Sequence, residues 1–262
     1  MDSSNIFILS PCPKSGSSML THLIGQHPNF GVGKHHFELR ENYMLGKMLD
    51  TMDWVAENPT VRQLVDPNED MVRNIHAFYW ESIDQTDELA WHHHQSDYLG
   101  VKFSSFKNFQ FLRYLFPNNP FIVIVRDPHD WYCSFNAWQA MQGEDRVPVH
   151  TWIDRYWRSP LRSLQKTSDE LYRIVKYEDM IESVPDVINS LYTWMGWEQR
   201  LMKHKDLPLV FTSTSTSPNE PMDHRGICTS RVGHSNGKLV PSDIEYLNLA
   251  ISEFPELGYR RK

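Results

Sequence analysis

Residues Asn5 to Ser18 read NIFILSPCPKSGSS, and the class of fold can be inferred from them. Its first six residues form a short apolar run bounded by Pro11, with the length and composition of a buried parallel strand. Small residues and one lysine follow this run. Four apolar residues then recur at helical spacing between Ser17 and Gln26, namely Met19, Leu20, Leu23 and Ile24. The order of strand, small-residue loop and helix predicts a phosphate-binding loop.

The loop from Pro13 to Ser18 (PKSGSS) has the chemistry of an anion site. Backbone N–H groups and the N-terminus of the following helix would converge there, and Lys14 would add a point charge. An NTPase P-loop carries its lysine directly after a glycine, whereas Lys14 precedes Gly16, so the NTPase pattern fits poorly. An ordinary Ser/Gly turn that caps a helix stays open as the alternative.

Strands and helices alternate along the rest of the chain. Strands are expected at 98–103 (YLGVKF), 121–125 (FIVIV) and 171–175, and helices at 106–116, 130–141, from about Pro185, and from Pro241. Another helix is expected to carry Trp152 and Trp157 into the core. This alternation predicts an α/β fold, a P-loop-like three-layer sandwich whose central parallel sheet is flanked by helices. The 262 residues are expected to form one domain, 1–262, in which 40–97 are helices and loops.

The amino-acid composition limits the kinds of binding partner and the cellular compartment that we expect for the protein. The 26 lysines and arginines against 33 acids give a net charge of −7, so no nucleic-acid partner is expected, and an anionic ligand needs a local basic cluster. The three cysteines, Cys12, Cys133 and Cys228, match neither a disulfide framework nor a zinc pattern, which indicates a reducing compartment. No signal peptide or membrane span is recognisable, so we expect a cytoplasmic protein with no membrane partner.

Three further motifs follow the loop in order. Arg126 ends the strand FIVIV, and Ser134 comes eight residues later. Tyr177-Glu178-Asp179-Met180 follows the strand LYRIVK, and SRVGHSNGK occupies 230–238. Together with PKSGSS, these motifs resemble the sulfotransferase family, whose donor is 3′-phosphoadenosine 5′-phosphosulfate (PAPS). The resemblance runs from Ile6 to Tyr259 and leaves only about 40–97 without a counterpart, a segment we expect to be a mainly helical insertion on the acceptor side.

The resemblance implies a set of nucleotide-binding residues. Arg126 and Ser134 correspond to the motif that binds the 3′-phosphate, and Tyr177 to a tyrosine beside the adenine. The full set that it implies is Ser15, Gly16, Ser17, Ser18, Arg126, Ser134, Tyr177, Arg231 and Gly233, the last two from a loop that closes over the 3′-phosphate. Two ordinary interpretations stay open: Arg126 as a surface arginine paired with Asp127 or Asp130, and Tyr177 as a core tyrosine.

The resemblance also implies catalytic residues. Lys14 would neutralise charge that grows on the leaving 5′-phosphate, and Lys102 lies on the strand that carries the base in the cytosolic branch of the family. The slot of that basic histidine holds Ser104, and an unperturbed serine is a poor base. Alignment with the tyrosylprotein branch through His27-Pro28 places the base's slot on His35. His36 and Glu38 are the reserve candidates, and a solvated strand end is the alternative interpretation of KHHFE.

The predicted activity is sulfuryl transfer from PAPS to a hydroxyl or amine of a small molecule or glycoside. A catalytically silent nucleotide-binding protein and a P-loop nucleotide kinase are the alternatives. No metal is expected, because the consecutive histidines His92-His93-His94 cannot all face one ion on a regular strand or helix. The sequence leaves the acceptor and the oligomeric state open.

Overall fold

A computed structural model describes residues 5–31, 98–103, 109, 113, 118–166, 171–199, 232, 233, 235 and 237–261. Its centre is a five-stranded sheet in the order β2-β3-β1-β4-β5, and every pair of neighbours is parallel. The strands are β1 (Asn5–Leu9), β2 (Phe30–Gly31), β3 (Tyr98–Phe103), β4 (Phe121–Val125) and β5 (Tyr172–Lys176). The predicted parallel α/β sheet is therefore confirmed.

The strand order places β1 at the point where the chain changes direction across the sheet. From β1 the chain passes to β2 and β3 on one side, and it then crosses to β4 and β5 on the other. Ile8 is in register with Lys102 on β3, and Leu9 with Val123 on β4. In open parallel sheets, ligands bind beyond the carboxyl ends of the strands at such a point. The loop that follows β1 occupies this position.

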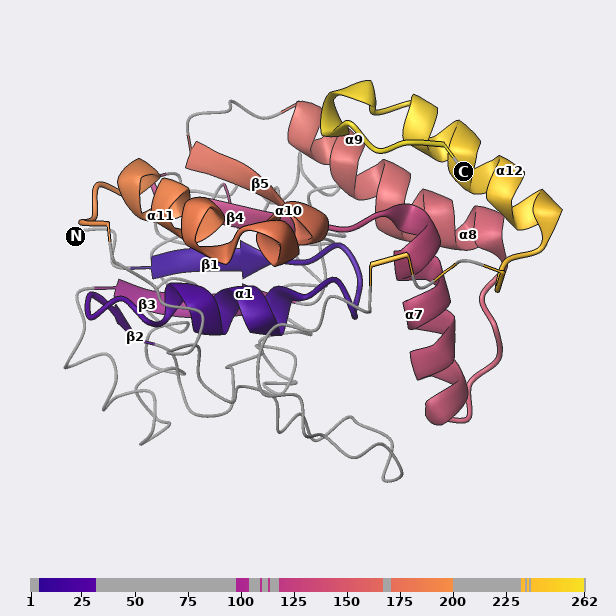
Figure 1. The fold of residues 1–262 in the computed structure, drawn as a ribbon, viewed down its shortest axis with the longest axis horizontal. Coiled ribbons are helices and arrows are strands. Elements are labelled where there is room, and N and C mark those ends of the chain that lie inside the picture. Colours follow the sequence, from indigo (N-terminus) through magenta and orange to yellow (C-terminus); the bar gives the residue numbers. More distant parts are fainter. Residues whose placement is uncertain are drawn as a thin grey trace, which may run out of the picture.

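Helices cover both faces of the sheet (Figure 1). One face carries α1 (Ser17–Ile24), α10 (Tyr177–Glu182) and α11 (Val184–Trp194). The other carries α7 (Pro128–Met141), α8 (Val149–Ile153), η2 (Asp154–Arg158), α9 (Ser159–Gln165) and α12 (Pro241–Ser252), and a 3₁₀ turn, η6 (Pro255–Leu257), follows α12. The described residues therefore form the three layers expected from the sequence.

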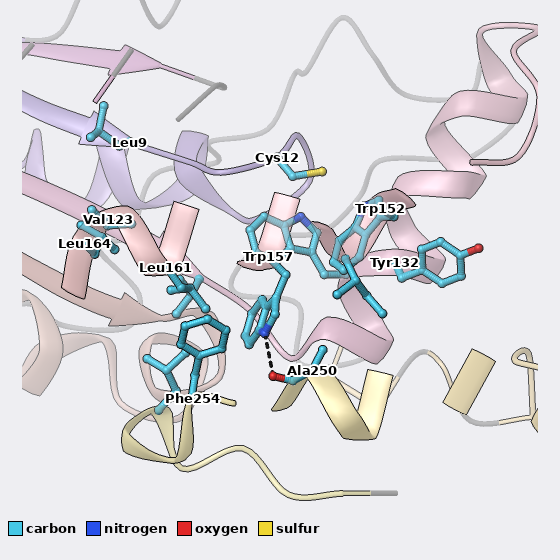
Figure 2. Close-up of a cluster of buried hydrophobic side chains, with 14 of the residues drawn as sticks. Leu9, Cys12, Val123, Tyr132, Trp152, Trp157, Leu161, Leu164, Ala250 and Phe254 are labelled. Atoms are coloured by element: carbon cyan, nitrogen blue, oxygen red, sulfur yellow. Dashed lines mark hydrogen bonds between the residues drawn. The ribbon is translucent and has the colours of Figure 1, made fainter. Parts of the chain in front are cut away.

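The core lies on both sides of β4, whose five residues are all buried. This explains why FIVIV is apolar throughout instead of alternating. The expectation that Trp152 and Trp157 belong to the core is confirmed, since both are at most 1% exposed. Trp157 lies in the π-helical turn η2 and donates its indole N–H to the carbonyl of Ala250 on α12, at 3.2 Å (Figure 2). This bond joins the C-terminal helix α12 to η2, which packs on the same face of the sheet.

Several boundaries differ from those expected. The strand predicted at 171–175 is β5, displaced by one residue, and the helix predicted from Asp130 begins at Pro128 because Asp127 caps it. The short strand β2 and helix α10 were not predicted. Of the helix expected at 106–116, only Phe109 and Arg113 are described, and both are helical. Residues 40–97 lie outside the described ranges.

Within the described ranges, no helix combines the length and the apolar character that crossing a membrane requires.

Candidate functional site

The loop between β1 and α1 is held by hydrogen bonds among its own small residues. The hydroxyls of Ser10 and Ser15, both fully buried, lie 2.6 Å apart. Ser10 also donates to the carbonyl of Cys12, and the N–H of Ser17 donates to Ser15 Oγ at 3.3 Å. The serines therefore fix the shape of the loop as well as adding polar groups to it.

The backbone of the loop has the geometry of an anion site. Lys14 has φ 67°, the one positive φ of a non-glycine residue in the described part of the chain, and Gly16 has φ 98°. Residues in this left-handed region let neighbouring N–H groups turn toward a common point. Helix α1 has neither a side-chain cap at Gly16 nor an acid in its first turn, so its positive end faces the loop uncompensated. A phosphate fits this environment.

Gly16 is required here by the close approach of Tyr177. A Cβ atom at Gly16 would lie 2.5 Å from Cδ2 and 2.9 Å from Cε2 of the tyrosine ring. Tyr177 begins α10 and is 8% exposed, and its ring lies against the loop at Gly16. The structure thus brings the first and third motifs of the sequence into direct contact.

Arg126 joins the loop to the second motif. Its Nη1 donates to the carbonyl of Lys14 at 3.3 Å and to Ser134 Oγ at 3.2 Å, and its guanidinium lies 4.7 Å from the centroid of the Tyr177 ring. The arginine is 4% exposed, so the interpretation of Arg126 as a surface residue was wrong. Arg126 and Ser134 are adjacent, as the predicted pairing of these residues requires.

Helix α7 makes two further contacts with the phosphate loop. Trp131 donates its indole N–H to the carbonyl of Pro13 at 2.9 Å. The ammonium of Lys14 lies 5.9 Å from the centroid of the Trp138 ring, a distance at which a cation and an aromatic face attract each other. Trp138 follows Ser134 by four residues and so lies on the same face of α7. The lysine side chain therefore extends along the face of α7 that carries Ser134.

Glu178 is a site residue to which the sequence analysis gave no role. Its Oε1 accepts the N–H of Asp127 at 2.9 Å, and its Oε2 accepts the hydroxyl of Tyr259 at 3.1 Å. Burial raises the pKa of Glu178, and the hydrogen bonds from Asp127 and Tyr259 partly oppose that rise. Burial also raises the pKa of Tyr259 well above its usual value, which keeps the phenol protonated as a donor. In the sequence, only its position directly after Tyr177 indicated that Glu178 belongs to the site.

Asp130 is the second residue without a sequence-based role. Its carboxylate accepts the N–H of Gly233 at 2.5 Å, and also the N–H and hydroxyl of Ser235 at 2.9 and 2.6 Å. The interpretation of Asp130 as a possible partner of Arg126 gave no hint of these contacts. Gly233, predicted to touch the nucleotide, thus lies beside the first turn of α7 with its N–H bonded to this carboxylate.

Other predicted residues are less fully defined. The backbone of Lys102 lies in β3 beside Ile8 of β1, close to the start of the loop. His35, His36, Glu38, Ser104 and Arg231 lie outside the described residues, as do His92, His93 and His94. Among the residues that are described, no group of three histidines, cysteines or acids could hold a metal ion.

Comparison with known proteins identifies the chain's relatives. A model of the sulfotransferase family matches residues 5–200. The fold is similar to that of the sulfotransferase domain from the curacin biosynthetic pathway (20% identity, TM-score 0.61, covering 98% of each chain). It is also similar to the sulfotransferase domain of the Synechococcus PCC 7002 olefin synthase (18%, 0.61, covering 97% of this chain and 94% of that one). A mouse sulfotransferase complexed with PAP matches at 11% identity and TM-score 0.57, over 98% of this chain and 86% of the other. No curated protein sequence matches significantly.

Proposed function

The chain belongs to the sulfotransferase family, and we propose that it transfers a sulfuryl group from PAPS to a hydroxyl or amine of a small-molecule or glycoside acceptor. The observation that carries the proposal is the position of Arg126. One guanidinium nitrogen bonds both the backbone of the phosphate loop and the hydroxyl of Ser134. The 5′-phosphate of a doubly phosphorylated adenosine would therefore lie beside Lys14 and its 3′-phosphate beside Arg126. The hydrogen bond between these two residues already holds them together.

The residues present fit this donor. The uncapped N-terminus of α1, with Lys14 and the amides of Ser15–Ser18, suits the 5′-phosphosulfate. Arg126 supplies a fork of N–H donors and Ser134 a hydroxyl, which suit the 3′-phosphate. The ring of Tyr177 is placed between Gly16 and Arg126, where it could contact the adenine. Arg231 and Gly233 complete the proposed nucleotide site.

The proposed chemistry needs positioning and charge stabilisation more than covalent participation. By analogy with phosphoryl transfer, the transition state is loose, and charge grows on the leaving phosphate as its bond to sulfur breaks. Lys14 neutralises this charge. His35, with His36 and Glu38 as alternatives, takes the proton of the acceptor's hydroxyl or amine as the new bond to sulfur forms. Lys102 adds positive charge from β3. The product that leaves is adenosine 3′,5′-bisphosphate.

The test is turnover of PAPS over a panel of hydroxyl and amine acceptors, with nucleotide affinity measured in parallel. His35→Ala should keep the affinity for adenosine 3′,5′-bisphosphate while turnover falls about 10²-fold or more, because only the base is lost. Undiminished turnover in this variant removes His35 from the mechanism. Nucleotide binding without transfer to any acceptor would instead favour the silent binding protein that Ser104 suggests.

A further inference from the structure

The first turn of α7 is bonded to a segment about a hundred residues away in sequence. Asp130 Oδ2 accepts the N–H of Gly233 at 2.5 Å, and Oδ1 accepts the N–H of Ser235 at 2.9 Å and its hydroxyl at 2.6 Å. Both carboxylate oxygens are thus engaged by one short piece of chain. Three donors from two nearby residues fix the orientation of that piece as well as its distance.

Burial makes this anchor strong. Asp130 is 1% exposed and Ser235 is 3% exposed, so water does not compete for these bonds. A carboxylate accepts from N–H and O–H donors more strongly than a neutral group does. Asp130 also lies in the first turn of a 14-residue helix, where the helix dipole favours a negative charge.

The anchor lies close to the residues assigned to the 3′-phosphate. Asp130 and Ser134 are four residues apart on α7, so they share a face and are separated by about 6 Å along the helix axis. Ser134 in turn accepts from Arg126. Gly233 and Ser235, which Asp130 holds, are therefore bonded to α7 about one helical turn from Ser134. Arg231, proposed for the same phosphate, precedes Gly233 by two residues in the sequence.

We propose that Asp130 is a positioning residue, which sets the C-terminal segment that contains Gly233 and Ser235 against the 3′-phosphate end of the nucleotide site and so creates the preference for a 3′-phosphorylated nucleotide. This inference rests on the proposed function. Asp130 itself does not touch the nucleotide, since a carboxylate would repel the phosphate. Asp130 affects nucleotide affinity only by fixing the position of the segment that contains Gly233 and Ser235.

The test compares the affinities of adenosine 3′,5′-bisphosphate and adenosine 5′-monophosphate by calorimetry. Asp130→Asn keeps the shape of the side chain but turns an N–H₂ group toward one of the bonded donors. The ratio of the two affinities should fall at least tenfold in this variant, chiefly through loss of bisphosphate binding. Hydrogen exchange at the Gly233 and Ser235 amides should accelerate as well. Asp186→Asn is the matched control, because Asp186 also occupies the first turn of a helix and bonds a serine hydroxyl, at an exposed position.

The outcomes are separable. A wild-type chain with no preference for the bisphosphate overturns the nucleotide assignment itself. A wild type that prefers it, together with an Asp130→Asn variant that keeps both the ratio and the amide protection, overturns the role of Asp130 alone. If Asp130→Asn fails to fold, Ser235→Ala removes one of the three bonds and should lower the ratio in the same direction. An unchanged ratio in a folded Ser235→Ala variant then contradicts the proposal.

Discussion

Lys14 occupies a backbone conformation that costs free energy in any residue with a Cβ atom. With φ 67°, it lies in the left-handed region, where strain is commonly retained at functional positions. Lys14→Gly should therefore be more stable than Lys14→Ala by about 1 kcal/mol, because only glycine relieves the strain. Both variants should lose turnover, since both lack the ammonium. Urea denaturation and a transfer assay measure the two effects, and equal stabilities would show that the loop is not strained at this residue.

Gly16 is constrained by the Tyr177 ring as well as by its φ of 98°. Gly143 is a matched control, because it has φ 75° and a Cβ atom there would meet no atom of the described residues within 4 Å. Gly143→Ala should cost about 1 kcal/mol from backbone strain. Gly16→Ala should cost about 1–3 kcal/mol more, because the new methyl group displaces the ring. Equal free energies of unfolding for the two variants would contradict the close packing of Tyr177 on the loop.

Glu178 predicts a pH dependence of stability. Burial raises its pKa in the folded state, so folding favours the protonated carboxyl. The stability that this group contributes is full below its unfolded pKa of about 4.3 and is lost as pH rises through the folded pKa. A glutamine can still accept from Asp127 and can donate to Tyr259. The stability of Glu178→Gln relative to the wild type should therefore improve as pH rises from about 4.3 through the folded pKa of Glu178, and then stay level.

Urea denaturation from pH 4 to pH 8 measures this difference. Glu182→Gln, at an exposed position on the same helix α10, controls for the change in net charge. A stability difference between Glu178→Gln and wild type that falls with rising pH would show that the carboxylate is favoured in the folded state.

At the scale of elements, α7 brings the separate motifs together. Asp127 caps it, Trp131 reaches the phosphate loop, Ser134 receives Arg126, and Asp130 holds the C-terminal segment. The motifs were visible in the sequence because each has a local pattern of residue types. The bonds of Asp130 and Glu178 were not, because each joins residues 51 to 105 positions apart, and neither residue type nor spacing encodes a partner at that distance.

Substitutions of Trp131 and Trp157 distinguish a hydrogen bond that serves nucleotide binding from one that serves stability alone. Trp131→Phe removes the N–H bond to Pro13, and Trp157→Phe removes the bond to Ala250 on α12. Each substitution should lower the free energy of unfolding by about 1 kcal/mol. Only Trp131→Phe should weaken binding of adenosine 3′,5′-bisphosphate, because only Trp131 holds the phosphate loop. Equal nucleotide affinities in the two variants would show that the bond from Trp131 to the phosphate loop does not contribute to nucleotide binding.

For the whole molecule, the sequence was sufficient to predict the layered parallel sheet. Strands buried on both faces are apolar throughout, and the helices between them show their own periodicity, so FIVIV and the helix from Pro185 were recognisable. The strand β2 has only two residues, too few to show a hydrophobic periodicity from which a strand could be predicted. Helix α10 begins directly at the end of β5, so no turn residue marks its start. The predicted base, His35, stays a prediction.

The most direct test of the account is a crystal structure of the chain with adenosine 3′,5′-bisphosphate. We predict that the 3′-phosphate lies about 3 Å from the Arg126 guanidinium and the Ser134 hydroxyl, and that the 5′-phosphate lies on the loop with Lys14. A nucleotide bound with its phosphates away from Lys14 and Arg126 would contradict the proposed site.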